Sequence, residues 1–255
     1  MHLSEMAVPY TLARLLPALP PAPARLVEVG AGHGALAAAL RDLGYGVTVV
    51  EPDAESAQAC RDRGLAVVQA PVAEFSGDGY DAVLFTRVLH HVPDPVDAVR
   101  RARAACRPGG VVVLEDFARD EVDLAAAGFV YDSRAVLAAA GLLPPDDADD
   151  ADDADPETDP ETDPETNASA DPLARWQDLP AEIGPIHPGA VVLAALGPTR
   201  TVERTEVLWR MVLSPAEGDA APLRPVAAVL RAVERRRIAE GTLPAIGIFA
   251  VSASA

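Results

Sequence analysis

A glycine-rich turn and an acidic residue that follows it could together bind an adenosine-containing ligand. Gly30, Gly32 and Gly34 come after a short apolar run and before a helical pattern. Glycines let the backbone approach a ligand at a helix N-terminus, where free N–H groups gather. Glu51 closes the next apolar run, 17 residues after Gly34. A carboxylate at that position can accept both hydroxyls of an adenosine ribose, so Glu51 is the strongest candidate for a ribose contact.

The glycine spacing by itself fits two classes of protein. Gly30, Gly32 and Ala35 also satisfy the G-x-G-x-x-G/A pattern of dinucleotide-binding dehydrogenases. An NAD-type oxidoreductase would in addition need a hydride-transfer site, and the later residues offer no candidate for one. More of the chain must therefore decide between the two classes.

Four motifs, of which the glycine loop is the first, follow one another along the chain. An acid, Glu28, lies two residues before the first glycine. The motifs are Val-Glu-Val-Gly-Ala-Gly-His-Gly at 27–34, Tyr-Asp-Ala-Val-Leu-Phe at 80–85, Val-Leu-His-His-Val with Asp-Pro at 88–95, and Arg-Pro-Gly-Gly at 107–110. Together these motifs resemble one family, the class I S-adenosylmethionine-dependent methyltransferases, in its small-molecule branch. They stand in the order and spacing of that family, and Pro-Gly-Gly before a strand is not expected in dehydrogenases.

This resemblance implies S-adenosylmethionine as cofactor and a set of contacts to it. Glu28 would orient the glycine loop, and carbonyl groups near Thr86 and Arg87 would face the methionine ammonium. The implied cofactor-binding residues are Glu28, Gly30, Ala31, Gly32, Gly34, Glu51, Val72, Thr86 and Arg87. Many relatives carry an aspartate for the adenine amino group where this chain reads Gln-Ala-Pro-Val-Ala-Glu at 69–74, so backbone groups near Val72 would have to serve there.

The resemblance also implies methyl transfer to a small molecule, with O-methylation as the first expectation and N- or C-methylation left open. His187, at the start of an expected helix, is the candidate general base; alternatively it packs against that helix or caps it. His90 and His91 are adjacent and should point apart, so we expect no metal site. A non-catalytic scaffold that binds the cofactor is the other alternative.

The elements that position these residues follow from hydrophobic periodicity. Apolar runs at 25–29, 47–51, 65–69, 80–85 and 111–117 predict buried strands that alternate with helices. Asp94 and Pro95 are a suitable N-cap and first helical residue. Later segments predict a helix at 133–140, a strand at 202–213, a helix at 223–238 and a last strand at 245–252. The expected fold class is α/β, a doubly wound, Rossmann-like, seven-stranded and mostly parallel sheet with an antiparallel C-terminal strand.

Four segments are expected along the chain. Residues 1–24 form an N-terminal helical lid, and residues 25–143 the cofactor-binding α/β core. Residues 144–172 form an acidic insertion with three Asp-Pro-Glu-Thr units and no large apolar residue, which predicts disorder. Residues 173–255 supply substrate-side helices and C-terminal strands that complete the same domain.

Composition narrows the choice of partners. The net charge is −18, but the acidic insertion holds 13 of the carboxylates. The rest of the chain contains 21 arginines and 26 acidic residues. With no clustered positive face, nucleic acid is a poor substrate candidate. Two cysteines suggest neither a disulfide framework nor a metal site, and no apolar run approaches the roughly 20 residues of a membrane helix. We therefore expect a cytoplasmic protein without membrane contact, and the sequence leaves its oligomeric state open.

Overall fold

The computed structural model describes residues 3–145, 171–178, 186–216 and 218–253. The chain divides into two compact units. One, here called the sheet unit, comprises Ser4–Asp120, Ile186–Thr205 and Ile246–Ala255; the other, the helical unit, comprises Met1–Leu3, Glu121–Pro185 and Glu206–Ala245. Most of the predicted acidic insertion, residues 146–170, lies outside the described residues, so its predicted disorder stays a prediction.

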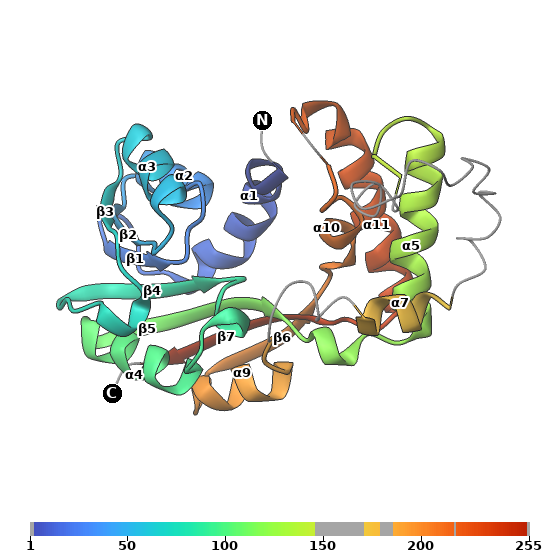
Figure 1. Ribbon diagram of the computed structural model, residues 1–255. Helices are drawn as coiled ribbons and strands as arrows, with labels where there is room; N and C mark the ends of the chain where they lie inside the picture. Colours follow the sequence, from blue (N-terminus) through green and yellow to red (C-terminus); the bar gives the residue numbers. More distant parts are fainter. Residues whose placement is uncertain (1–2, 146–170, 179–185, 217, 254–255) are drawn as a thin grey trace, which may run out of the picture. The chain divides into compact units, whose positions relative to one another are not determined.

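The sheet unit is built on a seven-stranded sheet in the order β3-β2-β1-β4-β5-β7-β6. β1 lies between β2 and β4 and is parallel to both, and β7 is antiparallel to β5 and to β6 (Figure 1). The strands are β1 Arg25–Val29, β2 Gly46–Val50, β3 Ala66–Val68, β4 Tyr80–Thr86, β5 Cys106–Phe117, β6 Thr201–Thr205 and β7 Gly247–Ala253. This is the predicted fold class, and the chain reverses direction across the sheet at β1 and β4, where ligands bind in doubly wound folds.

Helices cover both faces of this sheet (Figure 1). The helices on one face are α1 Leu3–Leu15, α2 Ala35–Asp42 and α3 Ala54–Asp62, and those on the other are α4 Pro95–Ala105 and α9 Gly189–Leu196. Each face buries its own apolar cluster, because side chains alternate along the strands. Short 3-10 helices lie in the connections between the strands and the α-helices. They are η1 Leu16–Ala18, η2 Val72–Glu74, η3 Leu89–His91 and η4 Arg119–Glu121.

Side-chain caps set where two of these helices begin. The Asp94 carboxylate accepts the backbone N–H of Asp97 at 2.9 Å, with Pro95 as the first helical residue, as predicted. The Asp53 carboxylate likewise accepts the N–H of Ser56 at 2.7 Å at the start of α3. Both caps satisfy N–H groups that have no partner inside the helix, and the second places α3 directly after Glu51.

The helical unit contains α5 Leu124–Ala139, α7 Pro172–Asp178, α10 Leu208–Val212, η6 Ala221–Leu223 and α11 Arg224–Ala239. α5 packs against α7 and α10, and α10 packs against α11. The Arg134 guanidinium donates to the carbonyl of Met211 at 2.7 Å and so ties α5 to α10. No helix in the described ranges is long and apolar enough to cross a membrane.

Two predictions about the later segments were wrong. The predicted strand at 202–213 ends at Thr205, and residues 208–212 form α10 instead, because the carboxylate of Glu234 caps that helix from α11. The predicted helix at 133–140 already begins at Leu124, since the Asp123 side chain accepts the N–H of Ala126 at 2.8 Å. The expected division of the chain into four segments stays a prediction; the structure assigns residues 206–245 to the helical unit and the described residues 186–205 and 246–253 to the sheet unit.

Candidate cofactor site

The glycine loop after β1 is packed tightly at its ends and open in its middle. Gly30 donates its N–H to Val50 at 2.8 Å, and a Cβ on Gly30 would lie 2.3 Å from the Val88 side chain. A Cβ on Gly34 would lie 2.7 Å from the sulfur of Cys60, whereas a Cβ on Gly32 would have no heavy atom within 4 Å. All three glycines have positive φ, between 53° and 72°. The loop therefore exposes its centre while its ends are fixed.

Glu51 ties this loop to the carboxyl end of β2. It is 6% exposed, and its Oε2 accepts the N–H of Gly32 at 2.9 Å while its Oε1 accepts the N–H of Asp53 at 3.2 Å. Each carboxylate oxygen can accept a further hydrogen bond. Glu51 is thus held in place by the backbone and can still accept two hydroxyl donors, and its contact with a ribose stays a prediction.

Glu28 lies beneath the loop as a buried acid with one partner. Its Oε1 accepts the hydroxyl of Thr86 at 2.8 Å, while its Oε2 is buried and has no hydrogen-bond partner among the residues described. Burial raises the pKa of Glu28 to about 7, and the Thr86 hydroxyl, the Arg87 charge and the Ala37 N–H oppose this only in part. An acid with an unused buried oxygen suits a site that a polar ligand completes.

Thr86 and Arg87, at the end of β4, connect Glu28 on β1 with Glu115 on β5. Arg87 adopts a φ of 59°, rare for a non-glycine residue, and its N–H donates to the Glu115 carbonyl at 2.6 Å. Its guanidinium donates to Oε1 of Glu115 at 3.0 Å, and the hydroxyl of Thr11 in α1 donates to the same oxygen at 3.0 Å. Sequence reasoning missed Glu115 and Thr11. Its one available signal was an acid at the end of an otherwise apolar strand.

Ala31 and Val72 lie at the borders of this site. Ala31 accepts the N–H of Gly34 at 3.0 Å and packs against the cluster on the α2 face. Val72 is buried in the opposite cluster, which also contains Val50, and its side chain packs there. Their cofactor contacts, like those of the other named residues, stay predictions.

His187 is anchored by the loop after β4. Its N–H donates to the His90 carbonyl at 2.9 Å, and its Nε2 lies 3.0 Å from the Val92 carbonyl, to which it can only donate. The first N–H of α9, that of Gly189, is capped by Asp120 at 2.8 Å instead. Nε2 is therefore used in a hydrogen bond to the protein, and only Nδ1 could act as a general base. That role stays a prediction.

His90 and His91 do not point apart, and that prediction was wrong. Their ring centroids lie 4.1 Å apart, because both residues belong to the short helix η3 rather than to a strand or α-helical turn. His90 is buried, with its Nδ1 2.5 Å from Oδ1 of Asp116 and its ring 4.6 Å from that of Phe117. Within the described ranges, no three His, Cys, Asp or Glu residues are grouped so as to hold a metal ion.

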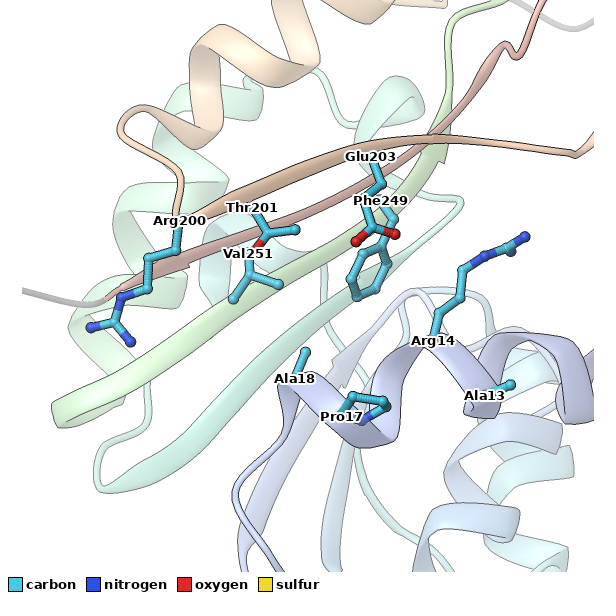
Figure 2. Close-up of a pocket in the computed structure, with 9 residues that line it drawn as sticks. All are labelled: Ala13, Arg14, Pro17, Ala18, Arg200, Thr201, Glu203, Phe249 and Val251. Carbon is cyan, nitrogen blue, oxygen red and sulfur yellow. The ribbon is translucent and has the colours of Figure 1, made fainter. Parts of the chain in front are cut away.

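A pocket of about 360 Å³ lies elsewhere in the sheet unit, between the α1–η1 segment and the β6–β7 edge. Figure 2 shows the side chains of Phe249 and Val251 extending from β7 toward that segment. Its lining residues are Ala13, Arg14, Pro17, Ala18, Arg200, Thr201, Glu203, Phe249 and Val251. None of the predicted cofactor residues belongs to it, so it is a space separate from the glycine loop.

Comparison with known families decides between the two classes that fit the glycine loop. The methyltransferase domain family matches residues 5–146, more than half of the chain, including the whole cofactor edge described above. The chain belongs to this methyltransferase family. The predicted class is thereby confirmed, and with it S-adenosylmethionine as the cofactor of this methyltransferase.

Curated proteins similar to this methyltransferase carry the name ubiquinone biosynthesis O-methyltransferase. It is 32% identical over 135 residues to a ubiquinone biosynthesis O-methyltransferase of Xanthomonas axonopodis pv. citri (strain 306), covering 49% of this chain and 54% of the relative. It is 32% identical over 105 residues to the protein of the same name from Bordetella avium (strain 197N), covering 38% and 44%. The chain spans about half the length of the curated relatives it matches.

Solved structures with similarity to this methyltransferase include an amino pentose methyltransferase from Micromonospora echinaspora with S-adenosylmethionine bound. That match has 26% identity and a TM-score of 0.40, and it covers 44% of this chain and 51% of the other. A second is the magnesium protoporphyrin IX methyltransferase of Synechocystis PCC 6803 with the same cofactor bound, at 17% identity, a TM-score of 0.40, and 46% and 59% coverage.

Proposed function

We propose that this methyltransferase transfers a methyl group from S-adenosylmethionine to a hydroxyl group of a small molecule. The observation that carries this proposal is the glycine loop, open at Gly32 and joined to the ribose-binding candidate Glu51 by a 2.9 Å hydrogen bond. The choice of oxygen as acceptor atom is supported by the O-methyltransferases among the curated relatives.

The residues present fit S-adenosylmethionine. The open face of Gly32 leaves room where a side chain would otherwise stand, and Glu51 offers two fixed acceptors to a pair of ribose hydroxyls. The unpaired Oε2 of Glu28 and the carbonyls around Thr86 and Arg87 are acceptors at the other end of the site. Glu51 would therefore hold the ribose. Gly32 would lie against the methionine portion of the ligand, and Glu28 would accept a hydrogen bond from its ammonium group.

The donor supplies a sulfonium methyl group that is already activated for transfer. The chain has to hold an acceptor in line with that group and keep water away. β1, β2 and β4 fix the glycine loop, Glu51 and Thr86 on one rigid sheet edge. α1 lies over the same face and is held there by the bonds from Thr11 to Glu115 and from Arg63 to Glu5. We propose that this helix is the lid expected for residues 1–24.

The proposal is tested by calorimetric titration of the purified protein with S-adenosylmethionine, S-adenosylhomocysteine and NADH. We expect micromolar binding of the first two and no heat from NADH. Binding of NADH with no response to either sulfur compound would establish the oxidoreductase alternative. Binding of S-adenosylmethionine without methyl transfer to any hydroxyl compound would favour the cofactor-binding scaffold.

A further inference from the structure

Two consecutive acids at the carboxyl end of β5 face opposite sides of the sheet. Asp116 lies on the α4 and α9 side, and both of its oxygens are used. Oδ1 accepts the N–H of Phe117 at 2.9 Å and lies 2.5 Å from Nδ1 of His90, and Oδ2 accepts the N–H of His90 at 3.3 Å. Asp116 is therefore a structural anchor for the loop after β4, since each of its two oxygens already has a protein partner.

Glu115 lies on the α1 side and is incomplete. Its Oε1 receives both the Thr11 hydroxyl and the Arg87 guanidinium. Its Oε2 is buried, and no group in the described part of the chain forms a hydrogen bond to it. A buried carboxylate oxygen is ordinarily hydrogen-bonded, so this atom calls for a donor from a bound molecule.

The position of Glu115 separates that donor from the cofactor. Glu28 on β1, Thr86 on β4 and Glu115 on β5 form a row on one face, with Thr86 directly paired to Glu115 across the strands. The glycine loop and Glu51 lie at the β1 and β2 end of this row. Glu115 lies beyond β4, at the opposite end, where a methyl acceptor would have to approach.

The pocket in Figure 2 does not include Glu115 in its lining but comes next to it through Phe249. Phe249 lines it and pairs with Glu115 across β5 and β7, so the two side chains are neighbours on the same face. Ala13 and Arg14, two and three residues after Thr11 in α1, form the opposite wall. An apolar, ring-sized body beside Phe249 would bring its polar substituent to Glu115.

We propose that Glu115 binds the hydroxyl group of a phenolic acceptor and takes its proton as the methyl group is transferred. The acceptor O–H donates to Oε2 of Glu115, and its proton passes to that oxygen. The acceptor oxygen forms the new bond to the methyl carbon while the S–CH3 bond breaks, with its electron pair remaining on sulfur. The products are the aryl methyl ether, S-adenosylhomocysteine and protonated Glu115, which returns its proton to solvent after release. This inference rests on the proposed function.

The test is methylation of two probe acceptors, catechol and the more acidic 4-nitrocatechol, by the native protein and by Glu115→Gln. A base matters less for an acceptor that is already ionised, so kcat/KM of the variant should fall at least about 10-fold for catechol but by less than about 3-fold for 4-nitrocatechol. The loss with catechol should shrink toward pH 9.5. The Kd for S-adenosylmethionine should stay within about 2-fold of the native value.

A purely structural role of Glu115 would lower both rates equally at every pH, and that result would overturn the inference. So would weakened S-adenosylmethionine binding, or a native protein that binds S-adenosylmethionine and methylates neither catechol. A native protein that does not bind S-adenosylmethionine would instead refute the proposed function.

Two further variants test the inference if Glu115→Gln folds poorly, one that alters the position of the carboxylate and one that serves as a control. Thr11→Val keeps the carboxylate but removes one of its anchors, and it should lower catechol kcat/KM about 3-fold through misplacement, again with the smaller loss for 4-nitrocatechol. Glu55→Gln changes an exposed acid in the first turn of α3 of the same unit and should leave both rates unchanged. Equal losses in Thr11→Val for the two acceptors would count against the inference.

Discussion

Two buried glutamates, one in each unit, share a raised pKa and differ in how their oxygens are used. Burial raises the pKa of Glu28 in the sheet unit and of Glu234 in the helical unit to about 7 in both cases. Glu234 accepts the N–H groups of Val207 and Leu208 on Oε1, at 2.7 and 2.8 Å, and that of Trp209 on Oε2, at 2.9 Å. Glu28 has one partner, and its other oxygen has none in the described part of the chain.

The difference separates a structural carboxylate from one that a ligand completes. Glu234 stands where the N-cap of α10 would stand, and it satisfies three N–H groups that the first turn of a helix leaves open. Glu28 caps no helix in this way, and its Oε2 has no hydrogen-bond partner in the described part of the chain, beside a loop that is open at Gly32. A perturbed pKa alone is therefore a poor guide to function here, whereas the unused oxygen is a discriminating one.

Glu234→Ala should have the largest effect on stability. It leaves three buried N–H groups without an acceptor, which should lower the unfolding free energy of the helical unit by about 3 kcal/mol or more. Both tryptophans, Trp176 and Trp209, belong to this unit, so urea unfolding followed by tryptophan fluorescence reports it selectively. Glu240→Ala, an exposed change near the end of α11, is the control and should shift the midpoint little. A small effect of Glu234→Ala would remove the contrast with Glu28.

Gly30→Ala and Gly32→Ala should separate packing from ligand space within one loop. Alanine at Gly30 would meet Val88 and hold an unfavourable φ, for a loss of about 2 to 3 kcal/mol. Alanine at Gly32 meets no neighbour and should cost about 1 kcal/mol of backbone strain, yet its methyl group would project into the proposed cofactor space. Thermal unfolding and calorimetric binding of S-adenosylmethionine check both. Unchanged affinity in Gly32→Ala would place the cofactor elsewhere.

Acidification from pH 8 to pH 5.5 should stabilise both units. Each glutamate binds a proton more tightly when folded, near pH 7, than when unfolded, near pH 4.5. The unfolding free energy therefore falls as pH rises through that window, by an amount on the order of 2 kcal/mol for each group. It levels off above about pH 8. Urea unfolding at the two pH values measures this, with tryptophan fluorescence for the helical unit and hydrogen exchange of β1 and β4 amides for the sheet unit. An increase in stability toward pH 8 would contradict the raised pKa values.

Glu28→Gln should have the smallest effect on stability. It removes a charge whose burial is poorly compensated while keeping a partner for Thr86, so the unfolding free energy at pH 8 should change by less than about 1 kcal/mol, in either direction. The opening free energy of the β1 amides, obtained after correction for the intrinsic pH dependence of exchange, should also become nearly independent of pH in the variant. A loss as large as that of Glu234→Ala would mean that Glu28 is a structural group as well.

The same contrast explains what the sequence could predict. The glycine loop, Glu51 and the parallel strands are encoded by neighbouring residues, and the fold class follows from them. The start of α10 is fixed by a carboxylate 25 to 27 positions away, so residues 202–213, read locally, resembled one strand. Glu115 became a candidate only when the structure showed that both oxygens of its neighbour Asp116 have protein partners, whereas Oε2 of Glu115 has none in the described part of the chain.

The most direct test of the cofactor site is the Kd for S-adenosylmethionine of native protein and of Glu51→Ala, measured by calorimetry beside the exposed control Glu55→Ala. Glu51→Ala removes charge-assisted hydrogen bonds worth roughly 1.5 to 3 kcal/mol each, so the account predicts at least about 10-fold weaker binding, with Glu55→Ala unchanged. Equal affinity in all three proteins would contradict the assignment of the ribose to β2 and the site built on it.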